Sequence, residues 1–242
     1  MPVTVEDRGE AALVVVRREE KANSLDVEHM TLLAEAVRRA CGEPRARLVA
    51  LTGSGRYFSA GLDLSMLAHE THTPREIASA AAGMLEAVVE CGKPIVSLVN
   101  GYAIGLGFEL VVASDTAAAV RGARLGLTAA RLGLVPPLSP FMGDRVLYRL
   151  ALSARVITAE EAFRLGIVER LVQSVNDLDG VLAGLADEYT RSTPWALEAI
   201  KRARTVFVRE ALSNGLRAFE ESLKRREPWE RARRFLESRH NK

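Results

Sequence analysis

Short apolar runs alternate along the chain with stretches whose apolar residues recur at helical spacing. The runs are rich in β-branched residues: ALVVVRR at 12–18, RLVALTG at 47–53 and PIVSLVN at 94–100. Helical spacing between the first two runs is kept by Val27, Met30, Leu33, Ala34 and Val37. Continuous apolar strands separated by amphipathic helices are typical of a parallel sheet covered by crossover helices. The pattern therefore predicts an α/β protein.

Capping residues mark the ends of the predicted helices. Gly42 can end the first helix, and TPRE at 73–76 predicts a capping box with proline at the first helical position. That helix is expected to stop near Gly92, and TAEE at 158–161 repeats the capping pattern. After about residue 180 the strand signal disappears. We therefore expect an α/β core over residues 1–180 and a helical region over 181–242 that packs on the core or on another subunit.

Composition narrows the classes of function. No apolar stretch approaches the roughly 18 residues of a membrane span, and no targeting segment is visible, which favours a cytoplasmic protein. Cys41 and Cys91 are interpreted as free thiols, which suit a reducing compartment. No metal site is expected, because the histidines lack partners at ligand spacing. These are His29, His69, His72 and His240.

The charge of the chain is unevenly distributed. The formal net charge is +2, yet residues 223–242 hold eight Lys or Arg against three Glu. A basic helix is more often a solvated or subunit-contact face than a nucleic-acid site, and aromatic residues for base stacking make up only 5% of the chain. Nucleic acid is therefore not an expected partner.

Two of the apolar runs lead into glycine-bearing turns, at residues 53–61 and 101–107. A dinucleotide-binding turn is excluded by spacing, because the third glycine of its motif would fall at Phe58. Two turns at the ends of successive strands can instead place two backbone N–H groups side by side, directed at one carbonyl oxygen.

The residues of these turns resemble a known family. FSAGLDLSML at 58–67 and NGYAIGLGFELVVASD at 100–115 resemble the two signature segments of the enoyl-CoA hydratase/isomerase (crotonase) superfamily, and the resemblance extends from residue 19 to residue 172. It implies a crotonase-type spiral of β-β-α turns with a C-terminal α-helical oligomerisation region. It also implies a homo-trimer or hexamer that acts on acyl-CoA thioesters, with no cofactor besides the coenzyme A of the substrate.

The resemblance also assigns roles to residues. It places an oxyanion hole at the N–H groups of Leu62 and Leu106, and Glu109 in the first helical turn as the acid-base. Apolar neighbours should raise the pKa of Glu109 toward the range of a general acid-base; the alternative is a carboxylate that only complements the helix dipole. The positions implied to contact the substrate are Lys21, Ala22, Ala60, Gly61, Asp63, Leu64, Gly107 and Leu134.

The sequence departs from the family pattern after Gly126. The second glutamate that hydratases use is expected at Ala129, and the following glycine-rich stretch is replaced by PPLSPFMGD at 136–144. One carboxylate suffices for a proton shift, whereas two explain hydration better. Isomerisation, decarboxylation, thioester hydrolysis and acyl-CoA binding without turnover therefore stay open beside hydration. Ser59 and Ser139 are interpreted as loop hydroxyls, because neither has the context of a nucleophile elbow.

Overall fold

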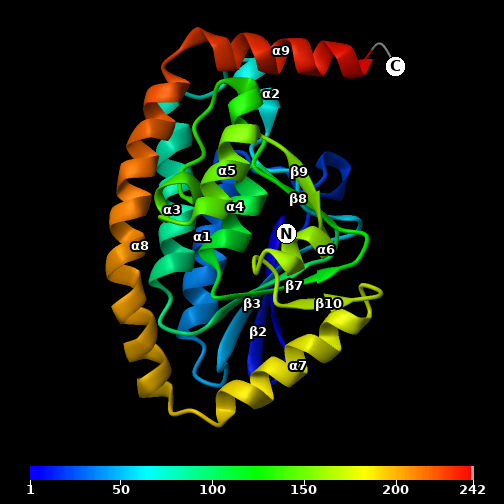
Figure 1. Cartoon of the computed structure of the whole chain (residues 1–242), viewed down its shortest axis with the longest axis vertical. Helices are drawn as coiled ribbons and strands as arrows, with labels where there is room; N and C mark the ends of the chain where they lie inside the picture. The colour runs from blue at the N-terminus through cyan, green and yellow to red at the C-terminus, as the bar shows by residue number, and fades with distance from the viewer. Residues whose placement is uncertain (241–242) are drawn as a thin grey trace.

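The computed structural model describes residues 1–240, which form two sheets wrapped by helices (Figure 1). The larger sheet has the order β1-β2-β3-β5-β7-β10 and is parallel apart from the β1–β2 pair. Its strands are β1 (Val3–Asp7), β2 (Ala11–Val16), β3 (Leu48–Gly53), β5 (Ile95–Val99), β7 (Thr116–Val120) and β10 (Arg170–Val172). The second sheet contains β4 (Tyr57–Ser59), β6 (Tyr102–Ile104), β8 (Arg124–Gly126) and β9 (Val156–Thr158).

Three strands of the large sheet are each followed by a short strand of the small sheet. β3 leads into β4, β5 into β6 and β7 into β8, and helices then return the chain to the large sheet. The predicted spiral of β-β-α turns is thereby confirmed. Its helices are α1 (Val27–Gly42), α2 (Leu64–Ala68), α3 (Pro74–Glu90), α4 (Leu106–Ala113), α5 (Arg145–Ser153), α6 (Ala159–Arg164), α7 (Asp177–Thr190), α8 (Pro194–Leu223) and α9 (Arg226–His240).

The predicted caps form at α3 and, in part, at α6. Thr73 and Glu76 make the complete capping box, with a Thr73 N–H to Glu76 Oε2 distance of 2.7 Å. At α6, Thr158 Oγ1 accepts the N–H of Glu161 at 3.1 Å, but the Glu161 carboxylate bonds Arg155 instead of returning to the cap. Helix starts were therefore predictable even where a second partner competes for the glutamate.

The interpretation of the two cysteines as free thiols is wrong, because Cys41 and Cys91 form a disulfide with a Cα–Cα distance of 5.8 Å. Cys41 lies in the last turn of α1 and Cys91 caps the C-terminal end of α3. These two helices pack side by side and lead into the neighbouring parallel strands β3 and β5, so that their ends coincide. The cysteines therefore give no support to a reducing compartment.

The C-terminal helices pack on the α/β core, as expected. Figure 1 shows α8 running along α3 and α9 crossing above α2. α8 is fixed near its start by Lys201, a buried side chain that pairs with Asp115, and by Arg204, 3.2 Å from the same carboxylate. Among the helices of residues 1–240, none is long and apolar enough to cross a membrane.

Candidate active site

The two glycine-bearing turns meet at contacts that leave no room for a side chain. A Cβ built on Gly61 would lie 2.4 Å from the carbonyl oxygen of Ile104 and 2.9 Å from the nitrogen of Leu106. A Cβ on Gly107 would lie 2.5 Å from the carbonyl oxygen of Ser59. Gly61 also has φ +82, a conformation that other residues rarely adopt. The glycines thus bring the segment after β4 against the start of α4.

The contact brings two backbone N–H groups to one place. Leu106 is the first residue of α4, so its N–H has no partner within the helix, and Leu62 directly follows Gly61. In the described part of the chain, neither N–H donates to a protein acceptor. Both N–H groups are therefore free to bind another acceptor beside the contact of the two turns, and the positive end of the α4 dipole lies at Leu106.

The loop before α1 is joined to the first turn by backbone hydrogen bonds. Ala60 N–H donates to Ala22 at 3.0 Å, and Leu25 N–H donates to Gly61 at 2.7 Å. The N–H of Asp63 in turn donates to Leu25 at 2.9 Å. Four of the positions implied to contact the substrate are thus brought together by the main chain: Ala22, Ala60, Gly61 and Asp63.

Arg18 is a residue of this region that sequence reasoning missed. Its guanidinium is 2.9 Å from Asp26 and 3.0 Å from Asp63, so it ties the loop to the turn. Burial alone would raise the pKa of Asp63, but hydrogen bonds from Ser65 and the charges of Lys21 and Arg18 hold it below its usual value. Asp63 is thus held as an anion by these contacts. The position of Arg18 after a strand gave no signal in the sequence that it would pair with Asp63.

Asn23 and Ser59 stabilise the same region from inside. Asn23 is fully buried at φ +52, and its side-chain amide donates to the carbonyl oxygens of Ser54 and Tyr57 at 2.9 and 2.7 Å. Ser59 Oγ donates to the carbonyl of Asn23 at 2.8 Å and accepts the N–H of Gly61 at 3.1 Å. Ser59 is therefore a buried bridge that fixes the first turn.

Glu109 lies one turn into α4, three residues after Leu106, and its side chain is fully buried. Its Oε2 accepts the N–H groups of Leu138 and Ser139, both at 3.0 Å, and its Oε1 accepts the Ser139 hydroxyl at 2.8 Å. Burial raises the pKa of Glu109 to about 7, although the three hydrogen bonds act to lower it. The carboxyl therefore titrates near neutral pH.

The segment that contacts Glu109 is the one that departs from the family pattern. Ser139 is completely buried, so its interpretation as a loop hydroxyl missed its contact with Glu109. Pro137 precedes the two donating N–H groups and has none of its own. The run PPLSP gave no signal of this contact, because three-dimensional proximity to Glu109 is not encoded in its local pattern.

The remaining predicted positions differ in burial and contacts. Lys21 is exposed, with its Nζ 3.8 Å from Asp63, and Leu64 starts α2. Leu134 is buried, and its N–H donates to the carbonyl of Ala129 at 3.1 Å. Of the histidines, His29 bonds Asp26, whereas the side chain of His240 lies outside the described residues.

Comparison with known proteins agrees with this geometry. The family model described as enoyl-CoA hydratase/isomerase matches residues 7–241, and the chain therefore belongs to that family. It is 32% identical over 188 residues to a carnitinyl-CoA dehydratase of Salmonella enteritidis PT4, covering 75% of this chain and 72% of the relative.

Solved structures share the fold. An enoyl-CoA hydratase/isomerase from Pseudoalteromonas atlantica T6c superposes with a TM-score of 0.83 at 27% identity, covering 98% of each chain. An enoyl-CoA hydratase from Bacillus halodurans has a TM-score of 0.85 at 24% identity, covering 96% of this chain and 99% of the other. The protein is thus an acyl-CoA-processing enzyme of the hydratase/isomerase type.

Proposed function

We propose that this enzyme moves a proton next to the thioester carbonyl of an acyl-CoA, with Glu109 as its single acid-base. In this proposal the N–H groups of Leu62 and Leu106 bind the thioester oxygen. The observation that carries it is the fully buried Glu109, with a pKa of about 7, one helical turn from Leu106. A carboxyl poised near neutral pH can both accept and return a proton.

The chemistry follows from the two groups. Removal of a proton from the α-carbon leaves a negative charge that spreads onto the thioester oxygen, where the two N–H groups stabilise it. One such donor contributes roughly 3–4 kcal/mol in enzymes where it has been removed. Return of the proton at the γ-carbon gives a double-bond isomer. Protonation at the α-carbon would complete a decarboxylation, in which the departing CO₂ leaves the enolate.

Two features favour this single-acid chemistry over hydration. Ala129 supplies no second carboxylate, and Pro137 supplies no N–H to hold a water. Dehydration of a 3-hydroxyacyl-CoA is the second candidate, supported by the 32% identity to a carnitinyl-CoA dehydratase. In that case Glu109 would take the α-proton and donate it to the hydroxyl on the β-carbon, which then leaves as water.

The test is turnover of a panel of thioesters, followed by mass spectrometry. The panel contains 2-enoyl, 3-enoyl, 3-hydroxyacyl, malonyl-type and saturated acyl-CoAs, so each candidate reaction has its own product. Glu109→Gln keeps the size of the side chain but removes proton transfer. We expect turnover to fall by roughly 10²–10⁴-fold while acyl-CoA affinity changes by no more than a few-fold.

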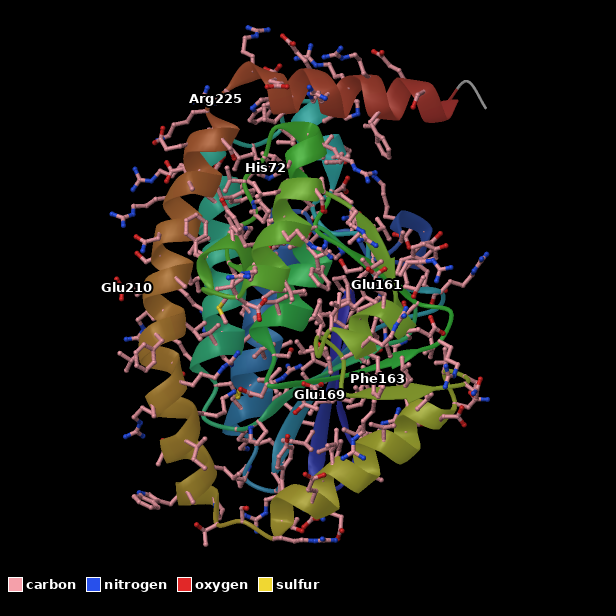
Figure 2. The ribbon with its side chains drawn as sticks, viewed as in Figure 1. His72, Glu161, Phe163, Glu169, Glu210 and Arg225 are labelled. Atoms are coloured by element: carbon pink, nitrogen blue, oxygen red, sulfur yellow. A yellow bond between two sulfur atoms is a disulfide. The ribbon has the colours of Figure 1, made fainter. Side chains whose placement is uncertain are left out.

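Glu169→Gln is the matched control, because Glu169 is another glutamate whose pKa burial raises, and it is not among the residues of the proposed site. It directly precedes β10, where Figure 2 labels it. Its carboxylate accepts the N–H of Ala117 in the large sheet. We expect its turnover to stay within two-fold of the parent. Full activity of Glu109→Gln would rule out the acid-base role, and tight binding of acyl-CoA without any turnover would favour a binding protein.

We also propose that the protein is a homo-trimer or a dimer of trimers. One side of α8 exposes several large apolar side chains, and Figure 2 shows Glu210 pointing outward from the same helix. The exposed residues are Trp195, Ile200, Val206 and Phe207. An apolar face of this kind is typical of a subunit contact. A monomer in light scattering at micromolar concentration would contradict the proposal.

A further inference from the structure

The segment that contacts Glu109 is held from its other side by α8. A Cβ built on Gly215 of α8 would lie 1.8 Å from the carbonyl oxygen of Pro137 and 2.8 Å from the ring of Phe141. About two turns further along α8, the buried Ser222 Oγ accepts the N–H of Val135 at 3.2 Å. The segment 135–141 is therefore packed between α8 and the carboxyl of Glu109.

We propose that α8 presses the segment 135–141 onto Glu109 and thereby fixes which oxygen of Glu109 carries the proton. Ser139, Gly215 and Ser222 are its positioning residues. The inference rests on the proposed acid-base role of Glu109 and adds to it the device that holds the acid. It gives the C-terminal helical region a function in the site besides packing and assembly.

The hydrogen bonds decide the position of the proton. A carboxylate offers about four lone-pair sites, two on each oxygen. Oε2 accepts two backbone N–H groups and is fully used, whereas Oε1 accepts only the Ser139 hydroxyl. Protonation of Glu109 therefore takes place at Oε1 as long as the segment keeps its place.

The same contacts set the proton affinity of Glu109. The groups that act on its pKa are burial, which raises it, and the hydrogen bonds of Ser139 and Leu138, which lower it. No charged side chain of the described residues is among these causes. Loss of a donor must therefore raise the pKa of Glu109, because the charged form loses a partner while burial remains.

Gly215→Ala is the main test, and Gly184→Ala is its matched control. Both are glycines inside helices, but a Cβ on Gly184 of α7 meets nothing within 4 Å. At Gly215 the new methyl group must displace Pro137. The N–H groups of Leu138 and Ser139 follow Pro137 in the chain, so they lose their alignment with Glu109 Oε2. We expect the pKa of Glu109 to rise by one or more in Gly215→Ala, to about 8 or higher, and to stay near 7 in the control.

Two milder variants test the same inference in case Gly215→Ala does not fold. Ser139→Ala removes the donor to Oε1, and Ser222→Ala removes the contact that holds Val135. We expect the pKa of Glu109 to rise to about 8 in Ser139→Ala and by less in Ser222→Ala, because the latter acts only through the segment. Thermal unfolding of each variant shows that it is folded.

The pKa is read in the protein without substrate, from the carboxyl stretch in infrared difference spectra, with Glu109→Gln identifying the band. The pH profile of kcat/KM gives an independent reading, and a purely structural role would not move it. An unchanged pKa in all three variants overturns the inference. If the pKa moves while Glu109→Gln keeps full turnover, the inference stands and the proposed acid-base function fails.

Discussion

The two sides of the candidate site use their backbone N–H groups in opposite ways. The turns at 59–62 and 104–107 leave the N–H groups of Leu62 and Leu106 without a protein acceptor in the described chain. The segment 135–141 instead donates two N–H groups to Glu109. In the proposed function, one side binds an oxygen of the substrate and the other holds the group that moves the proton.

The two sides also differ in what keeps them in place. The turns are fixed by backbone contacts at Gly61 and Gly107 that exclude any side chain, and by the buried amide of Asn23. The segment is held by the side chains of Ser139 and Ser222 and by packing on α8. If the proposed function is right, changes in the turns should abolish binding of the oxyanion, whereas changes in the segment should shift the pKa of Glu109.

The largest effect is expected at Gly61, where the two turns are in contact. Gly61→Ala would place a methyl group 2.4 Å from the carbonyl of Ile104 and 2.9 Å from the donor nitrogen of Leu106. The two turns must then separate, and the paired donors no longer meet one oxygen. We expect kcat/KM to fall by about 10²-fold or more, since loss of one oxyanion donor costs that much elsewhere.

Gly9→Ala is the control for this prediction. Gly9 has φ +72, close to the φ +82 of Gly61, but a Cβ there meets nothing within 4 Å. It therefore reports backbone strain alone, with a loss of about 1 kcal/mol in the free energy of unfolding and no change in kcat/KM. Equal losses of activity in both variants would show that close approach of the turns is not what matters.

The side built from glycine turns was predictable from the sequence, and the other side was not. Glycine spacing marks turns that need close approach, so the convergence of Gly61 and Gly107 follows from a local pattern. The free donors Leu62 and Leu106 lie beside them. The contact of Ser139 with Glu109 joins residues 30 positions apart, and nothing in the local pattern of either predicts it.

The same distinction between local patterns and distant contacts explains why some strands could be predicted from the sequence and the disulfide could not. Long β-branched runs gave β2, β3 and β5, whereas three-residue strands such as β4 and β6 are too short to show a period. The disulfide joins Cys41 and Cys91 across 50 residues. Each cysteine ends a crossover helix before a neighbouring parallel strand, and that shared position was the one signal that could have paired them.

A smaller effect on activity is expected from the disulfide, which joins α1 to α3, the helices that lead into β3 and β5. In the chain-entropy account, closing a loop of 50 residues stabilises a protein by about 4 kcal/mol. Cys41→Ser with Cys91→Ser should lower the free energy of unfolding by that order and leave kcat/KM within about two-fold, because the turns have their own contacts. Urea unfolding with and without reductant measures the stability.

The double variant also serves as the control for reduction. Reductant should destabilise the parent and leave the double variant unchanged, since only the parent has a bond to break. If the parent unfolds at the same urea concentration in both conditions, the disulfide does not stabilise the protein. A large loss of activity in the folded double variant would show that the glycine turns depend on the bond between α1 and α3.

The smallest effect is expected at Glu109, on the other side of the site, and it measures how much burial of this carboxyl destabilises the fold. The pKa of Glu109 is about 7 in the folded protein, against an ordinary value of 4.5. The folded state therefore favours the protonated acid, and this stabilisation is complete below pH 4.5 and is lost as the pH rises through 7. The loss amounts to at most about 3 kcal/mol at pH 8.

Glu109→Gln carries no charge at any pH, so it removes this dependence. The glutamine oxygen can accept the two N–H groups of Leu138 and Ser139, and its amide can donate to the Ser139 hydroxyl. The variant should exceed the parent in urea unfolding by less than about 1 kcal/mol at pH 5 and by up to about 3 kcal/mol at pH 8. An equal difference at both pH values would mean that the pKa of Glu109 is not raised in the folded protein. The segment 135–141 would then hold a carboxylate that is already ionised, and the acid-base role would have to lie elsewhere.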